Sequence, residues 1–127
     1  MDTNMSDLYV AIKEDRKLLS ELIDKLKNIN RKLAKAERQY KEEFTKSVLI
    51  LNVEGYKGKI NGKEYDTEGI AWTASTQIAR GLPKVAEKRQ TRDILKGDKE
   101  AVMQKIYQVK MEINSAEKEM EAISRCE

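Results

Sequence analysis

Residues 8–40 read LYVAIKEDRKLLSELIDKLKNINRKLAKAERQY, with an apolar residue recurring at alternating steps of four and three. This stripe continues to residue 44, and only Asp15 breaks it. Neither glycine nor proline occurs between residues 6 and 54. A long seven-residue apolar repeat is typical of a helix that packs along one seam. We therefore expect one helix over residues 6–54, started by Ser6 and ended by Gly55.

A second apolar stripe of the same kind runs over residues 85–123, interrupted only at Lys99. Pro83 suits the first turn of a helix, so the second long helix is expected over residues 83–124. Gly97 favours a kink rather than a break, because the repeat continues in phase across it. Two stripes joined by a short connector predict a mainly α fold: two long antiparallel helices forming a coiled-coil hairpin.

The connector, residues 55–82, holds most of the glycines and the only tryptophan. Asn-Gly at positions 61–62 favours a type I′ turn and predicts a β-hairpin over residues 56–65. Residues 67–80 then have the apolar spacing of a short helix. A two-stranded hairpin is marginal by itself, so we expect it to pack on the helices and the whole chain, 1–127, to form a single domain.

The seam also bears on self-association. Two helices bury little surface, so we expect two or more copies to pair through the same stripes, as a homodimer or a higher homo-oligomer. Large side chains that lie on or near the two stripes are expected to be buried in this seam or in the core. These residues are Tyr9, Tyr40, Met103, Tyr107, Met111 and Met120.

Composition argues against an enzyme. The chain has no histidine and one cysteine, which removes the commonest general base and the usual zinc ligands. Glu64, Asp66 and Glu68 alternate as magnesium ligands would, but such acids are more often solubilising. We therefore expect no catalytic residue, no metal and no cofactor. No secretion signal or apolar run of about 20 residues is visible, which predicts a cytoplasmic protein without a membrane partner.

Charge is sorted along the chain, although the net charge is only +3. Bases concentrate in residues 25–41 and 80–96. The simplest interpretation is a solvated helix face, and the functional one is a surface for nucleic acid or for an acidic protein. The candidate residues for this surface are Lys27, Arg31, Lys35, Arg38, Lys84, Lys88, Arg89 and Arg92.

The connector supplies a second set of candidate contacts, because loops on rigid scaffolds commonly carry binding. Trp72 is either an anchor for a partner or a packing residue, and packing is favoured since tryptophan is mostly buried. The candidates for partner binding are Lys57, Lys59, Tyr65, Trp72 and Arg80.

Several short motifs occur in residues 30–123. They are Ala36 with Tyr40, Ala79-Arg80-Gly81, Val85-Ala86, Arg92-Asp93 and Lys110-Met111-Glu112-Ile113. In these the chain resembles a family of small uncharacterised phage and prophage coiled-coil proteins of Gram-positive bacteria, from which it departs in the hairpin at residues 56–66. The resemblance implies a phage origin and the cytoplasm of a bacterial host, and it implies no activity for particular residues.

Three functions remain open. The first is a non-enzymatic accessory protein of a phage or mobile element that binds a host or phage protein, with inhibition of a host defence or nucleic-acid-processing enzyme as one form. The second is a nucleic-acid-binding accessory in phage recombination or replication. The third is a structural coiled-coil assembly element.

Overall fold

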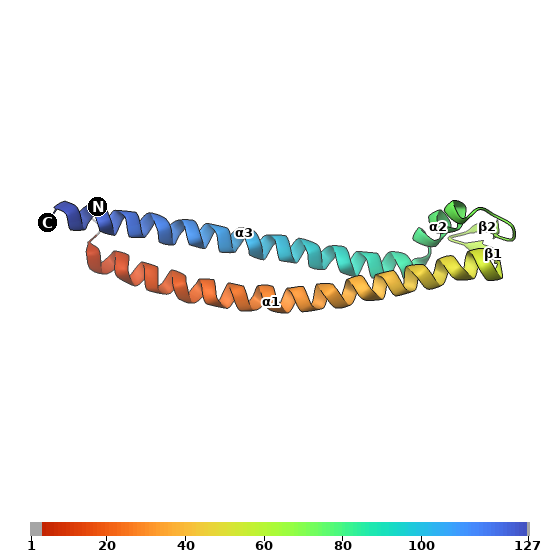
Figure 1. The fold of residues 1–127 in the computed structure, drawn as a ribbon, viewed down its shortest axis with the longest axis horizontal. Coiled ribbons are helices and arrows are strands. Elements are labelled where there is room, and N and C mark those ends of the chain that lie inside the picture. The colour runs from red at the N-terminus through yellow and green to blue at the C-terminus, as the bar shows by residue number, and fades with distance from the viewer. Residues whose placement is uncertain (1–3, 127) are drawn as a thin grey trace. The chain divides into compact units, whose positions relative to one another are not determined.

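A computed structural model describes residues 4–126 of the chain (Figure 1). The elements follow in the order α1 (Met5–Leu49), the π-helix η1 (Ile50–Glu54), β1 (Lys57–Ile60), β2 (Lys63–Asp66), α2 (Trp72–Arg80) and α3 (Pro83–Cys126). The prediction of a mainly α fold is confirmed: two long antiparallel helices are joined by a β-hairpin and a short helix. Gly97 lies within α3 and does not interrupt it.

Contacts divide the described residues into two compact units, and each is described by itself. The terminal unit comprises residues 4–30 and 97–126, and the connector unit comprises residues 31–96. Each unit holds one part of α1 and one part of α3.

The terminal unit is held by the predicted seam. Its core consists of Ile29 from α1 with Val102 and Ile106 from α3, and leucines of α1 pack against them. Nearer the chain ends, Arg16 Nη2 lies 3.0 Å from Glu117 Oε1. Early residues of α1 thus meet late residues of α3, as an antiparallel pair requires.

The start of α1 differs from the prediction. The helix begins at Met5, and Asn4 rather than Ser6 is its N-cap, since the Asp7 amide donates to Asn4 Oδ1 at 2.8 Å. Both side chains are suited to the position, and the sequence did not distinguish them.

The seam assignment was wrong for part of the side chains given to it. Tyr9, Met103, Tyr107 and Met111 are all exposed to at least half of their surface. The positions of the repeat that are buried on α3 are Val85, Val102, Ile106 and Val109. One step along a helix turns a side chain by about 100°, so neighbours of a seam residue face elsewhere.

The connector unit has a core of a different kind. Val48 and Leu51 at the end of the first long helix pack with Ile60 of β1 and Ala79 of α2. Half-buried side chains from the first helix, the β-hairpin and its approach, α2 and the α2–α3 loop surround them: Phe44, Tyr56, Tyr65, Ile78 and Leu82. The hairpin is therefore packed on the helices, as expected.

The predicted hairpin is confirmed. Its two strands pair antiparallel from Lys57 opposite Asp66 to Ile60 opposite Lys63. Asn61 and Gly62 both have positive φ, at 52° and 82°, as the type I′ turn needs.

The predicted short helix, residues 67–80, was wrong at its start, because α2 begins only at Trp72. Thr67 instead closes the hairpin: its Oγ1 accepts from the Tyr56 amide at 2.6 Å, and its own amide donates to the Tyr56 carbonyl at 2.9 Å. Gly69, with φ of 76°, then takes a conformation that an α-helix excludes.

The end of the first helix also differs from the single regular helix predicted to residue 54. Ile50–Glu54 form a π-helix, which ends at Gly55 as predicted, with φ of 76°. The side-chain amide of Asn52 donates to the Ile70 carbonyl at 3.4 Å and to Ser75 Oγ at 3.2 Å. These bonds join the π-helix to α2 and to the segment that precedes α2.

Candidate partner-binding surface

The connector unit contains an apolar hollow, which we call the junction groove. It lies between the end of the first helix, the β-hairpin and the loop before α3, and has a volume of about 310 Å³. Ile50, Tyr56, Leu82 and Pro83 contribute to its walls, and Lys59 is its only charged lining residue. The groove can therefore accept an apolar side chain with a carboxylate near it.

A hydrogen bond braces one side of the groove. Asn61 Nδ2, in the hairpin turn, donates to the carbonyl oxygen of Gly81 at 2.8 Å. The bond joins the tip of the hairpin to the α2–α3 loop, so two walls of the groove are fixed to each other. A groove with fixed walls loses little conformational entropy when it binds.

Exposed apolar side chains continue the groove along the first helix. Leu49 and Val53 are 46% and 72% exposed, and Ile50 is 36% exposed. Leu49 and Ile50 line a second hollow of about 690 Å³, together with Lys41, Lys46 and acidic neighbours. Because Ile50 lines both hollows, they meet at its side chain. We call Leu49, Ile50 and Val53 the apolar ridge.

Of the connector candidates, only Lys59 lines the junction groove. Lys57 Nζ lies 3.8 Å from Asp66 Oδ2 and 3.9 Å from Glu68 Oε2, so it is paired on the hairpin. Tyr65 packs on the core, with Lys63 Nζ 5.5 Å from its ring centroid.

The remaining connector candidates are Trp72 and Arg80. Trp72 is 53% exposed at the start of α2 and does not belong to the core cluster. The side chain of Arg80 is exposed, and its backbone carbonyl accepts a hydrogen bond from Arg89 Nη1 at 3.3 Å. Both are accessible in the connector unit, and neither lines the junction groove.

The basic candidates divide into two groups. Arg31, Lys35 and Lys84 are exposed in the connector unit, as is Arg38, whose Nε lies 3.9 Å from Glu42 Oε1. Lys27 is exposed in the terminal unit. These side chains are available to solvent.

Three basic residues of α3 are partly turned inward. Lys88 and Arg89 are half-buried. The guanidinium carbon of Arg92 lies 4.4 Å from the centroid of the Tyr40 ring, and its Nη2 is 3.0 Å from Asp93 Oδ1. With its side chain 22% exposed, Arg92 joins the two helices by a cation–π contact.

The apolar ridge was missed in the candidate set, although the sequence contains its signal. Residues 48–51 are Val-Leu-Ile-Leu, four apolar residues in succession. One face of a helix buries only some of such a run, here Val48 and Leu51. The others, Leu49 and Ile50, must then be exposed or contact something else.

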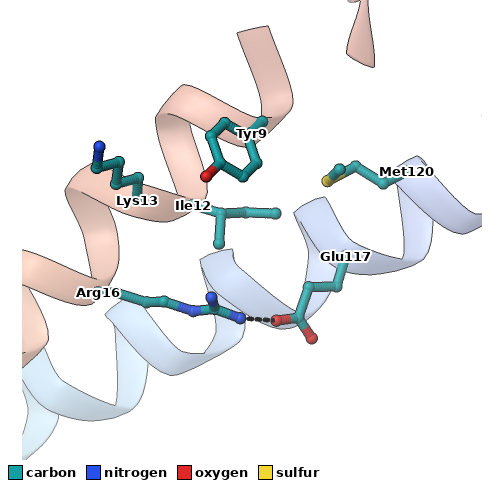
Figure 2. A pocket seen from close by; sticks show the side chains of 6 residues that line it. All are labelled: Tyr9, Ile12, Lys13, Arg16, Glu117 and Met120. Atoms are coloured by element: carbon teal, nitrogen blue, oxygen red, sulfur yellow. Dashed lines mark hydrogen bonds and ion pairs between the residues drawn. The ribbon is translucent and has the colours of Figure 1, made fainter. Parts of the chain in front are cut away.

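The terminal unit has a hollow of its own, of about 430 Å³ (Figure 2). Tyr9 and Ile12 of α1 face it from one side and Met120 of α3 from the other, and the Arg16–Glu117 ion pair crosses between the helices. Its lining carries both charge signs, from Lys13 and Arg16 on α1 and from Glu117 on α3.

Residues 4–126 contain no group of three His, Cys, Asp or Glu side chains that could hold a metal ion. Asp66 and Glu68 instead share Lys57, and the Glu68 amide donates to Asp66 Oδ1 at 3.1 Å. None of the helices over these residues combines the length and apolar character that a membrane crossing requires.

The fold defines the class of a two-helix hairpin protein whose connector forms a small β-hairpin and helix. No protein-family model, curated protein or solved structure matches the chain. Its function is therefore inferred from its own surface.

Proposed function

We propose that the chain is a non-enzymatic accessory protein of a phage or mobile element, and that it acts by binding another protein through the connector unit. The observation that carries this proposal is the apolar ridge beside the junction groove. Contiguous exposed apolar surface is typical of interaction sites.

The charge of the connector unit supports an acidic partner. Residues 31–96 hold 15 Lys and Arg against 9 Asp and Glu, a net charge of +6. Such an excess attracts an acidic surface and speeds the encounter, while burial of the ridge supplies affinity. A host defence or nucleic-acid-processing enzyme is the partner class that we propose to test first, on the strength of the phage resemblance.

The test is affinity capture from lysates of a Gram-positive host, before and after phage infection, followed by titration of the captured protein. Leu49→Glu should weaken its binding by roughly tenfold or more, since a central apolar contact becomes a buried charge. Val10→Glu is the matched control, because Val10 is 49% exposed on the same helix but lies in the terminal unit. Absence of a stoichiometric protein, or equal effects of both variants, would contradict the proposal.

A second candidate function is nucleic-acid binding, favoured by the exposed bases Arg31, Lys35 and Lys84. It predicts affinity for single- or double-stranded DNA that falls steeply across a salt series. The double variant Arg31→Glu/Lys35→Glu should then reduce both the affinity for DNA and the dependence of that affinity on salt concentration. Leu49→Glu should change the affinity for DNA little. DNA binding that is absent at low salt excludes this function.

A further inference from the structure

The two lysines of β1 differ in what their charges meet. Each stands opposite an acid of β2: Lys57 opposite Asp66, and Lys59 opposite Glu64. Lys57 Nζ lies 3.8 Å from Asp66 Oδ2, whereas no ion pair of Lys59 is found within residues 4–126. Lys59 is exposed and lines the junction groove, so its charge is available to a molecule that binds there.

A second polar group of the groove comes from the first helix. Ser47 is only 7% exposed and lines the groove. Thr76 and Thr91 donate their hydroxyls to helix carbonyls, but no such bond of Ser47 is found within residues 4–126. No buried polar side-chain atom of these residues lacks a partner, so the Ser47 hydroxyl must open onto the groove. It can donate to an oxygen of a bound molecule.

The apolar walls of the groove are formed before anything binds. Tyr56 Oη donates to the Lys59 carbonyl at 3.3 Å, which holds the ring along β1. Gly58 leaves room for this ring, because a Cβ there would lie 2.8 Å from Tyr56 Oη. Leu51 and Ile60 also line the groove and belong to the buried core. An apolar side chain that enters therefore meets a pocket whose shape is already set.

The size and position of the groove favour a protein segment as its occupant. A volume of about 310 Å³ lies at the small end of the range for binding pockets, about 300–1,000 Å³, and suits a single large side chain. Ile50 belongs both to the groove and to the apolar ridge. A segment that places one apolar side chain in the groove can place further ones on the ridge, and a small free acid cannot.

We infer that the junction groove recognises an acidic segment of the partner protein, through a leucine or phenylalanine side chain with a carboxylate beside it. The apolar side chain fills the groove, and the carboxylate of the neighbouring Asp or Glu pairs with Lys59 Nζ. This inference rests on the proposed function. It adds the residue type that is bound and the residue, Lys59, that selects for negative charge.

The division of labour between the groove and the lysine follows from their surroundings. Burial of the apolar side chain supplies the affinity, because the lining is mostly apolar. Lys59 is exposed, so its ion pair adds little affinity and mainly disfavours segments without an acid. Lys57 cannot serve in the same way, since Asp66 and Glu68 already neutralise it.

Nuclear magnetic resonance titrations of the full chain with short peptides test this recognition. The probe is the acetylated and amidated dipeptide leucyl-glutamate, whose side chains supply both groups. It should shift the backbone amide signals of Ile60, Asn61 and Leu82 saturably, with a dissociation constant of about 1–10 mM, because it fills one small pocket. Leucyl-glutamine has the same shape without the charge and should bind about threefold more weakly. Alanyl-glutamate, which lacks the large side chain, should bind more weakly still.

Lys59→Gln and Lys57→Gln are matched variants, because each removes one positive charge from an exposed position of the same strand. Lys59→Gln should abolish the preference for leucyl-glutamate over leucyl-glutamine. Lys57→Gln should retain that preference. Circular dichroism and the unshifted signals of the core verify that both variants remain folded.

Several results would overturn the inference. One is the absence of saturable shifts up to about 30 mM leucyl-glutamate. Others are equal affinities of the wild type for the two leucyl dipeptides, or equal losses of preference in the two lysine variants. Octanoate tests a free aliphatic acid as the occupant: if it binds more tightly than leucyl-glutamate and depends on Lys59, a protein segment is not what the groove serves.

Failure of this inference is distinguishable from failure of the proposed function. A captured partner whose binding is weakened by Leu49→Glu but not by Lys59→Gln overturns the inference and leaves the proposed function intact. Selective dipeptide binding without any captured protein supports the chemistry of the groove and contradicts the proposed function.

Discussion

The terminal unit and the connector unit use the same two helices and stabilise them by different means. In the terminal unit, Ile29, Val102 and Ile106 belong to a repeated seam, and each contact resembles the next. In the connector unit, one cluster around Val48 and Ala79 gathers side chains from the helices, the hairpin and their loops. We therefore expect a single substitution in the cluster to destabilise the connector unit strongly. A single substitution in the seam should have a smaller effect, because many similar contacts remain.

The two units also differ in charge. The connector unit has a net charge of +6, and the remaining residues of the chain, with 10 bases and 13 acids, have −3. Around the exposed apolar side chains of the connector unit lie Lys41, Lys46 and Lys59 together with Glu42 and Glu54, so lysines are in slight excess there. This excess agrees with the acidic partner proposed for the connector unit.

The largest expected effect is that of Val48→Asp in the connector core. Val48 is 2% exposed, so the carboxylate would be buried without a partner, and unfolding of this unit should become easier by about 4 kcal/mol or more. Trp72, the only tryptophan, reports the connector unit by fluorescence, while circular dichroism reports all helices. The fluorescence transition in urea should precede the helical one.

Leu49→Asp is the control for that experiment, because Leu49 is adjacent and 46% exposed. Its effect on unfolding should remain below about 1 kcal/mol. Simultaneous loss of fluorescence and helical signals in Val48→Asp would show that the two units unfold together, which would break the contrast between them.

Thr67→Val should have the next largest effect. Thr67 is fully buried, and its hydroxyl accepts from the Tyr56 amide at 2.6 Å. Valine keeps the shape but leaves this amide unsatisfied, which costs about 1–3 kcal/mol. Urea unfolding followed by Trp72 fluorescence measures the loss. Thr45→Val, at an exposed threonine of α1, should change stability by less than about 0.5 kcal/mol; an equal loss there would refute this role of the hydroxyl.

The sequence predicted the repeated part of the fold well, for a physical reason. A seam repeats its pattern over many residues, so the stripe through Leu26, Ile29 and Leu33 identifies the buried face by itself. The Asn61-Gly62 turn was equally predictable, because few residue pairs accept two positive φ angles.

Features that depend on long-range bonds were not predictable in the same way. The start of α2 is set by Thr67 bonding to Tyr56, and the π turn is tied down by Asn52 reaching Ser75. The apolar ridge follows from which side of the first helix faces its neighbours. The contact of Arg92 with Tyr40 joins residues that are far apart in the chain, so the sequence did not reveal it. For that reason Arg92 was assigned to a basic surface.

A smaller effect, of opposite sign, is expected from Gly97→Ala in the terminal unit. Gly97 lies inside α3, and a Cβ there would meet no atom within 4 Å. Alanine should therefore stabilise the helix by about 0.5–1 kcal/mol, because it restricts the unfolded chain. Thermal unfolding followed by circular dichroism measures the gain. Gly62→Ala is the contrasting variant: its φ of 82° makes alanine strained, and stability should fall. Destabilisation by Gly97→Ala would indicate that α3 needs flexibility at this position.

The smallest effect is expected from the ion pair between Arg16 and Glu117, which crosses the seam of the terminal unit. The two side chains are 66% and 49% exposed, so water screens their attraction. A double-mutant cycle with Arg16→Gln and Glu117→Gln should give a coupling of about 0.5 kcal/mol, which disappears in about 1 M salt. A coupling above about 1.5 kcal/mol that persists in salt would mean that a single polar contact fixes the register here. The terminal unit would then depend on one specific pair, as the connector unit depends on Thr67, and the repeat would no longer account for its stability.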